Sequence, residues 1–188
     1  MSRPFSDYTN VFFWDFKRMD NVNYNFGIAE ILYKAKKQNG NDYRLNKPII
    51  LTIISVIECI LYDFVRRVNE HRNEIIPNLD DAVVLDTRMK TLDQLEPLVV
   101  HIKKNNLLRV SGNDSIYDDL EHLRKVRNRI HIQNTQQQLD RDECNVFTND
   151  NLRLAEKCLE RICEVLCHVY PRPDRDFCSM SDFPRPWI

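Results

Sequence analysis

The stretch from Asn46 to Asn69 constrains this chain most, because it is apolar on almost every side of a helix. Such a helix must be enclosed by other elements on several sides. Pro48 is compatible with its first turn, where the missing N–H is not needed. The apolar residues are Ile49, Ile50, Ile53, Ile54, Val56, Ile57, Ile60, Leu61, Phe64, Val65 and Val68. In a domain of this size, a second copy of the chain is the simplest extra cover, which predicts a homodimer.

This stretch is not expected to cross a membrane. Glu58 and Asp63 interrupt it, and the clean apolar run is shorter than the roughly 20 residues that a bilayer requires. The first 20 residues contain no continuous apolar segment of the kind that directs secretion. We therefore expect a cytoplasmic protein without membrane contact.

The six cysteines are expected to be reduced thiols. Cys158, Cys163 and Cys167 lie in a helical pattern, where free cysteine packs as a small hydrophobic residue. His168 is adjacent, but no second cysteine pair accompanies this group, as a zinc site would require. The sequence therefore predicts core packing and no metal site.

The chain contains only three glycines, which favours helices joined by polar loops over a fold with many strand turns. Helical periodicity marks the segments 23–38, 46–69, 91–108, 114–132 and 148–170. Gly40 can end the first, because glycine accepts left-handed geometry. Thr91 and Gln94 have the spacing of a capping box at the start of the third. Pro97 instead favours a start near Glu96. The prediction is an all-α bundle of four to five helices around a long apolar central helix.

Two flanking regions differ from this helical domain, which we expect to span residues 22–170. Residues 1–21 form a leader rich in aromatic side chains, which are expected to pack on the domain or on a partner subunit. Residues 171–188 contain four prolines and are expected to form a tail without helix. The length of 188 residues fits one domain with a substantial core.

The segment 123–131 carries the residues best suited to chemistry, since four of its nine residues are cationic. On a helical wheel, two arginines, an asparagine and a histidine fall on one flank beside the apolar stripe. These are Arg124, Arg127, Asn128 and His131. Lys125 and Arg129 are expected to point to solvent, where they would contact RNA. Because the net charge is −1, any nucleic-acid binding must come from such a local patch.

This segment resembles the motif helix of the HEPN superfamily, small all-α domains that include many metal-independent RNases of toxin–antitoxin, abortive-infection and CRISPR systems. Their motif is an Arg, four to six residues, then a His, on a late helix before a final long helix. Arg124 fits this spacing, with six residues before His131, whereas Arg127 fits through its neighbour Asn128, since a polar residue often follows the motif Arg. Some relatives carry a modified Tyr two places after the His, where this chain has Gln133. The resemblance covers roughly residues 22–170.

The resemblance implies an endoribonuclease that cuts RNA through its own 2′-OH, acting as a toxin or defence effector under an inhibitor protein. His131 would act as base or acid, and Arg124 or Arg127 would bind the phosphate. Asn128 would orient the phosphate or the ribose. One histidine cannot fill both acid and base roles, so a homodimer would supply the second. The reaction requires no cofactor or metal.

Other interpretations remain open. Asp118, Asp119 and Glu121, or carboxylates elsewhere, could pair with the arginines and leave ordinary surface charge. A HEPN-type fold could also bind RNA, a nucleotide or a protein without catalysis, which needs no imidazole. Glu58 needs a partner inside the apolar helix. We expect it to support an arginine of the motif helix rather than to catalyse.

Overall fold

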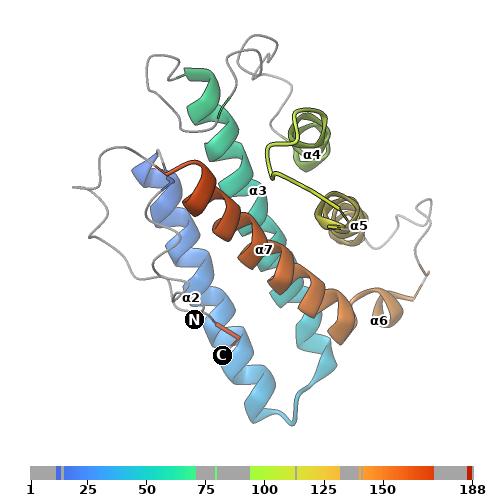
Figure 1. The fold of residues 1–188 in the computed structure, drawn as a ribbon. Coiled ribbons are helices and arrows are strands. Elements are labelled where there is room, and N and C mark those ends of the chain that lie inside the picture. The colour runs from blue at the N-terminus through green and yellow to red at the C-terminus, as the bar shows by residue number, and fades with distance from the viewer. Residues whose placement is uncertain are drawn as a thin grey trace.

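The computed structural model describes residues 12–13, 15–70, 79, 94–112, 114–131, 140, 142–171 and 186–187. Within these residues it contains helices and no strand, which confirms the all-α prediction for this part of the chain. The helices are α2 (Phe16–Gln38), α3 (Asn46–Glu70), α4 (Leu95–Lys104), α5 (Ile116–Asn128), α6 (Glu143–Val146) and α7 (Asn149–Val169), with a short 3₁₀ helix η1 (Tyr43–Leu45). In Figure 1, α3 runs through the centre, α2 lies along one side, and α4 and α5 lie on the other. α7 crosses over α3.

The central helix α3 is enclosed by its own chain. All the apolar residues that predicted it are at most 2% exposed. α2, α4, α5 and α7 each pack against it. The prediction of an enclosed central helix is therefore confirmed. The expected second copy is not needed as cover, so the apolar circumference of α3 no longer argues for a dimer.

Among the described residues, the segment Tyr43–Asn69 has the length and composition that could cross a membrane. Most of its apolar window is nevertheless buried inside the protein. The core helix of a globular domain satisfies the same criteria of length and hydropathy. The segment thus occupies the buried central position that its sequence predicts.

α2 begins at Phe16, earlier than the predicted 23, because Asp15 caps it. The Asp15 carboxylate accepts hydrogen bonds from the backbone N–H groups of Lys17 and Arg18. The last residues of the expected leader therefore belong to this helix. Phe12 and Phe13 stack with ring centroids 5.0 Å apart and are buried in the core. For these two rings, packing on the domain is confirmed. Phe16 is the first residue of α2, and the leader's other aromatic residues lie outside the described part.

α4 begins at Leu95, which confirms the later of the two predicted starts. Pro97 falls in the first turn, where the N–H has no partner within a helix. The first backbone bond of the helix runs from Leu98 N–H to Gln94 O over 3.3 Å. The Gln94 side chain makes no cap hydrogen bond, and Thr91 lies outside the described residues.

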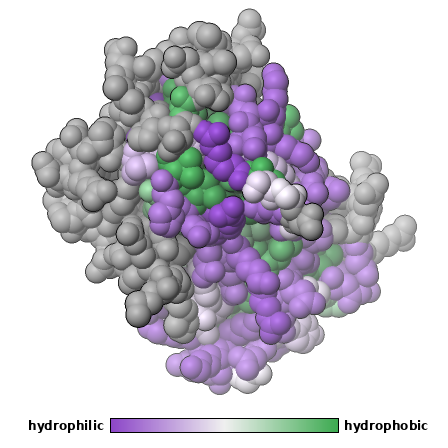
Figure 2. Space-filling view, viewed as in Figure 1, coloured by the Kyte–Doolittle hydropathy of each residue, from purple (hydrophilic) through white to green (hydrophobic). Residues whose placement is uncertain are grey.

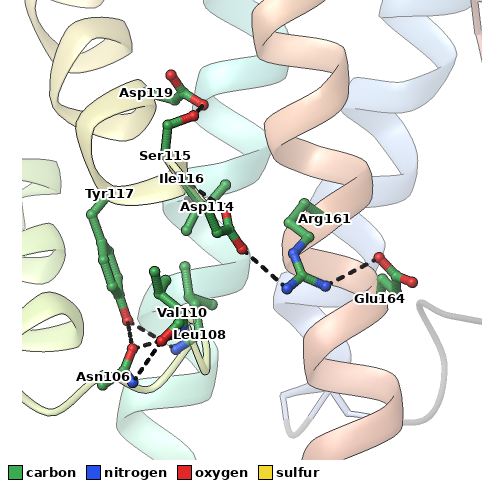
Figure 3. A network of polar contacts seen from close by, with 10 residues as sticks. All are labelled: Asn106, Leu108, Val110, Asp114, Ser115, Ile116, Tyr117, Asp119, Arg161 and Glu164. Atoms are coloured by element: carbon green, nitrogen blue, oxygen red, sulfur yellow. Dashed lines mark hydrogen bonds and ion pairs between the residues drawn. The ribbon is translucent and has the colours of Figure 1, made fainter. Parts of the chain in front are cut away.

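The connection between α4 and α5 is fixed by the polar network in Figure 3. Asn106 adopts a left-handed backbone (φ 45°), and its side-chain oxygen accepts from Val110 N–H at 2.9 Å. The Tyr117 hydroxyl donates to the same oxygen at 3.1 Å and accepts from Leu108 N–H at 3.1 Å. These contacts join the first turn of α5 to the end of α4 and fix where α5 starts.

α7 has the start that its sequence predicts. The Thr148 side chain accepts from Asn151 N–H, which caps the helix. At the other end, the buried Arg67 of α3 donates to the carbonyls of Tyr170 and Pro171. A cation at the carboxyl end of a helix also complements its dipole. The carboxyl end of α7 is therefore fixed to the core helix α3.

Candidate functional site

α5 ends at Asn128, earlier than predicted, and this changes where the following side chains lie. Arg129 N–H bonds to Val126 O and Ile130 N–H to Arg127 O, each over 3.1 Å, so the backbone tightens into three-residue turns. As a result Arg129 is only 2% exposed, whereas Ile130 is 48% exposed. The prediction that Arg129 points to solvent is therefore wrong. Continued as a regular helix, the segment would instead place Ile130 with the buried residues Val126 and Leu123. A helical wheel does not apply beyond the last helical residue.

His131 follows this turn and is exposed. Within the described part of the chain, it makes no hydrogen bond or ion pair. Because it lies past the end of α5, the wheel that places Arg124, Arg127 and Asn128 on one flank does not fix the direction of its imidazole. The structure thus presents a solvent-facing histidine next to the motif helix rather than on it.

Arg124 is firmly bound to carboxylates. Its Nε and Nη2 donate to Glu121 at 2.9 and 2.7 Å, and its Nη1 lies 3.1 Å from Glu96 Oε2. Its side chain is only 14% exposed. The hydrogen bonds from Arg124 lower the pKa of Glu121, and Glu121 in turn raises the pKa of Arg124. Arg124 therefore joins α5 to α4 in the way that the surface-charge alternative predicts.

Arg127 is held more loosely. Its Nη2 lies 3.4 Å from Glu58 Oε2, beyond the 2.7–2.9 Å of a strong charge-assisted hydrogen bond. The Arg127 side chain is 43% exposed and that of Glu58 is 19% exposed. The expected pairing of Glu58 with an arginine of the motif helix is therefore confirmed. Lys125 and Asn128 are half-buried and make no hydrogen bond within the described residues.

The basic residues also stabilise α5 without any ligand. Lys125 and Arg127 lie in its last turn, and Arg129 follows as the cap residue. Cations near the carboxyl end of a helix complement its dipole, each by about 0.3–1 kcal/mol when exposed. Part of the cationic pattern thus has a purely structural explanation.

The cysteines of α7 pack in the core, as predicted. Cys158 and Cys163 are free and buried. Burial raises the pKa of the Cys158 thiol to about 12 and raises that of Cys163 as well, which disfavours the thiolate that binds metals. Among the described residues, no group of three or more His, Cys, Asp or Glu side chains is placed to hold a metal ion.

A cavity of about 720 Å³ lies away from all these residues, between α2, the first turns of α7 and the C-terminal segment Pro186–Trp187. None of the predicted site residues lines it. The sequence contains only a weak signal for it, the cluster of lysines near the end of α2. Helix periodicity cannot show that these lysines meet α7 and a tryptophan from the tail.

The comparisons with known proteins do not assign the chain to a family. No family model, no curated protein and no solved structure matches it. The resemblance to the HEPN superfamily therefore depends on the motif residues and on the order of the helices.

Proposed function

We propose that this protein is a metal-independent endoribonuclease of HEPN type, acting in the cytoplasm as a homodimer. The observation that carries the proposal is the exposed His131 directly after a helix whose Arg127 is partly exposed and weakly paired. An imidazole supplies proton transfer near neutral pH, and a guanidinium neutralises a phosphate. Following the resemblance, its activity is that of a toxin or defence effector, restrained by an inhibitor protein.

Arg127 is the phosphate-binding arginine in this proposal, and Arg124 is structural. A phosphate must displace one contact of 3.4 Å to reach Arg127. To reach Arg124 it must displace three contacts of 2.7–3.1 Å around a side chain that is 14% exposed. Bidentate contacts between arginine and carboxylate are among the strongest hydrogen bonds in proteins. Arg127 is therefore the less costly choice, although Arg124 fits the family spacing to His131.

The reaction uses the RNA itself as nucleophile. One His131 takes the proton of the ribose 2′-OH, whose oxygen then forms a bond to phosphorus. The bond from phosphorus to the 5′ oxygen breaks, and His131 of a second copy donates a proton to that oxygen. The products are a 2′,3′-cyclic phosphate and a 5′-OH end. Arg127 stabilises the charge that develops on the phosphorane, and Asn128 orients the phosphate or ribose.

The dimer in this proposal is required by the chemistry and supported by an exposed apolar side chain. Ile130 is 48% exposed and directly precedes His131. A contact between two copies at this turn would bury both Ile130 side chains and bring both imidazoles to one phosphodiester. Lys125 lies on the adjacent turn and adds positive charge for the RNA backbone.

The test is cleavage of mixed RNA by the purified protein in the presence of a chelator. We expect RNA ends with 2′,3′-cyclic phosphate from the wild type and a loss of at least about 100-fold in rate for His131→Ala. The matched control is His168→Ala, since His168 is an exposed histidine on α7. The proposal fails if His131→Ala cleaves as fast as the wild type, or if the wild type leaves no cyclic phosphate.

A second candidate is a non-catalytic domain that binds RNA, a nucleotide or a partner protein. It is favoured by one observation, namely that Arg124 and Arg127 already have carboxylate partners. On this alternative His131→Ala leaves both RNA binding and stability unchanged, and the wild type does not cleave. A gel-shift titration beside the cleavage assay separates the two candidates.

A further inference from the structure

The cavity between α2 and α7 combines positive charge with aromatic surface. Its cations outnumber its carboxylates four to two. The cations are Lys34, Lys36, Lys37 and Arg153, and the carboxylates are Glu30 and Glu156. Where Figure 2 colours the face of the molecule that carries α2 and α7, hydrophilic side chains cover more of it than hydrophobic ones. A volume of about 720 Å³ lies within the range of small-molecule sites.

Two of the four cations already form hydrogen bonds or ion pairs with neighbouring residues. Lys34 pairs with Glu30 at 2.5 Å, and Lys36 donates to Asn46 and Asn149 at 2.6 and 2.9 Å. Burial lowers the pKa of Lys36, so an anion nearby would favour its charged form.

Lys37 and Arg153 are exposed at the cavity and make no hydrogen bond or ion pair within the described residues. They are therefore available to an anionic ligand. α7 begins at the same cavity, and its first turn adds a partial positive charge.

The other wall of the cavity is aromatic and fixed in place. The Tyr33 hydroxyl donates to Glu156, which ties α2 to α7. Trp187 donates from its indole nitrogen to Glu160 at 3.1 Å, and its ring centroid lies 6.3 Å from that of Tyr33. A held indole can stack on the π-face of a planar ring.

We propose that this cavity binds a phosphorylated planar-ring compound of the size of a nucleoside monophosphate. Lys37 and Arg153 bind the phosphate, and Trp187 stacks on the ring. Two cations that make no hydrogen bond or ion pair within the described residues lie at the same cavity as an indole held by a hydrogen bond to Glu160, which matches the two ends of such a ligand. None of these residues belongs to the proposed nuclease site, so the inference does not rest on the nuclease proposal.

Isothermal titration calorimetry with adenosine monophosphate tests the site, with inorganic phosphate and adenosine as the two halves of the ligand. We expect one adenosine monophosphate per chain, bound at least about tenfold more tightly than either half. The Lys37→Ala/Arg153→Ala variant should lose at least about tenfold in affinity for adenosine monophosphate, because both phosphate contacts are removed. The Trp187→Leu variant should bind adenosine monophosphate more weakly than the wild type does, with an affinity closer to that for inorganic phosphate.

Lys157→Ala is the matched control, since Lys157 is exposed on α7 one turn after Arg153 and does not line the cavity. It should bind adenosine monophosphate as the wild type does. The inference is overturned if the wild type binds no adenosine monophosphate, or if the double variant binds it equally well. It is also overturned if Lys157→Ala weakens binding as much as the double variant, because the attraction is then only general charge. Both residues of the double variant are exposed, so its fold is retained, which circular dichroism would verify.

Discussion

Two groups of cations on this small domain differ in what surrounds them. On α5, Arg124 and Arg127 both have carboxylate partners, namely Glu121 and Glu96 for Arg124 and Glu58 for Arg127. At the cavity between α2 and α7, some of the cations have no hydrogen-bonding or ion-pairing partner within the described residues. The density of basic residues in a sequence therefore does not locate a ligand-binding site. What matters is how strongly each cation is already bound.

The largest effect of a substitution is expected at Arg127, the weakly paired arginine. Arg127→Ala should lower the rate of RNA cleavage by about 100-fold or more, because it removes charge stabilisation in the transition state. Its free energy of unfolding should change by less than about 1 kcal/mol, since the pair with Glu58 is long and partly exposed. Cleavage kinetics and urea denaturation measure the two effects. An active Arg127→Ala protein would remove Arg127 from the mechanism.

Replacing Arg124, the strongly paired arginine, should affect stability more than RNA cleavage. Arg124→Ala is expected to lower the free energy of unfolding by about 1–2 kcal/mol, because it removes three hydrogen bonds between charged groups. Thermal unfolding should then occur about 2–8 °C lower. Residual cleavage at a temperature where the variant is folded should exceed that of Arg127→Ala. If Arg124→Ala is as stable as the wild type, the proposed division of roles is wrong.

The smallest effect concerns two glutamates whose pKa values shift in opposite directions. Arg124 lowers the pKa of Glu121 below its ordinary value of 4.5, whereas burial raises that of Glu156 above it. The stabilisation from Glu121 is therefore present above pH 4.5 and is lost as the pH falls through its folded-state pKa. The contribution of Glu156 is fully present below pH 4.5 and is lost as the pH rises through its folded-state pKa.

Melting curves between pH 3 and 7 measure these opposite trends. Relative to the wild type, Glu121→Gln should become less stable as the pH rises, and Glu156→Gln should become more stable. We expect differences of at most about 2 °C, because both groups are partly solvated. Trends of the same sign in both variants would contradict the contrast between the two regions.

The sequence predicted the existence and approximate positions of the helices better than the residues at which they begin and end. The start and length of α3 and the cap of α7 at Thr148 follow from patterns that local physics decides. The early start of α2 depends on Asp15 as a cap. The sequence contains this residue, but the aromatic residues around it led to the prediction of a separate leader. Local sequence patterns could not show what covers α3, because its cover comes from the packing of four other helices of the same chain.

At the candidate sites as well, the sequence predicted some contacts and missed others. The pairing of Glu58 with the motif helix was predictable, since a carboxylate in an apolar helix needs a partner. The burial of Arg129 was not, because it depends on the tight turn after Asn128. The cavity at Trp187 depends on a contact between α2, α7 and the tail, which no periodicity in the sequence reports.

The most direct test is to mix wild-type and His131→Ala subunits at constant total protein and let them re-equilibrate before cleavage is measured. If each phosphodiester needs one imidazole from each copy, the rate falls as the square of the wild-type fraction. An equal mixture then retains about a quarter of the wild-type rate. A rate that falls in direct proportion to the wild-type fraction, leaving half the activity in that mixture, would contradict a site shared by two subunits.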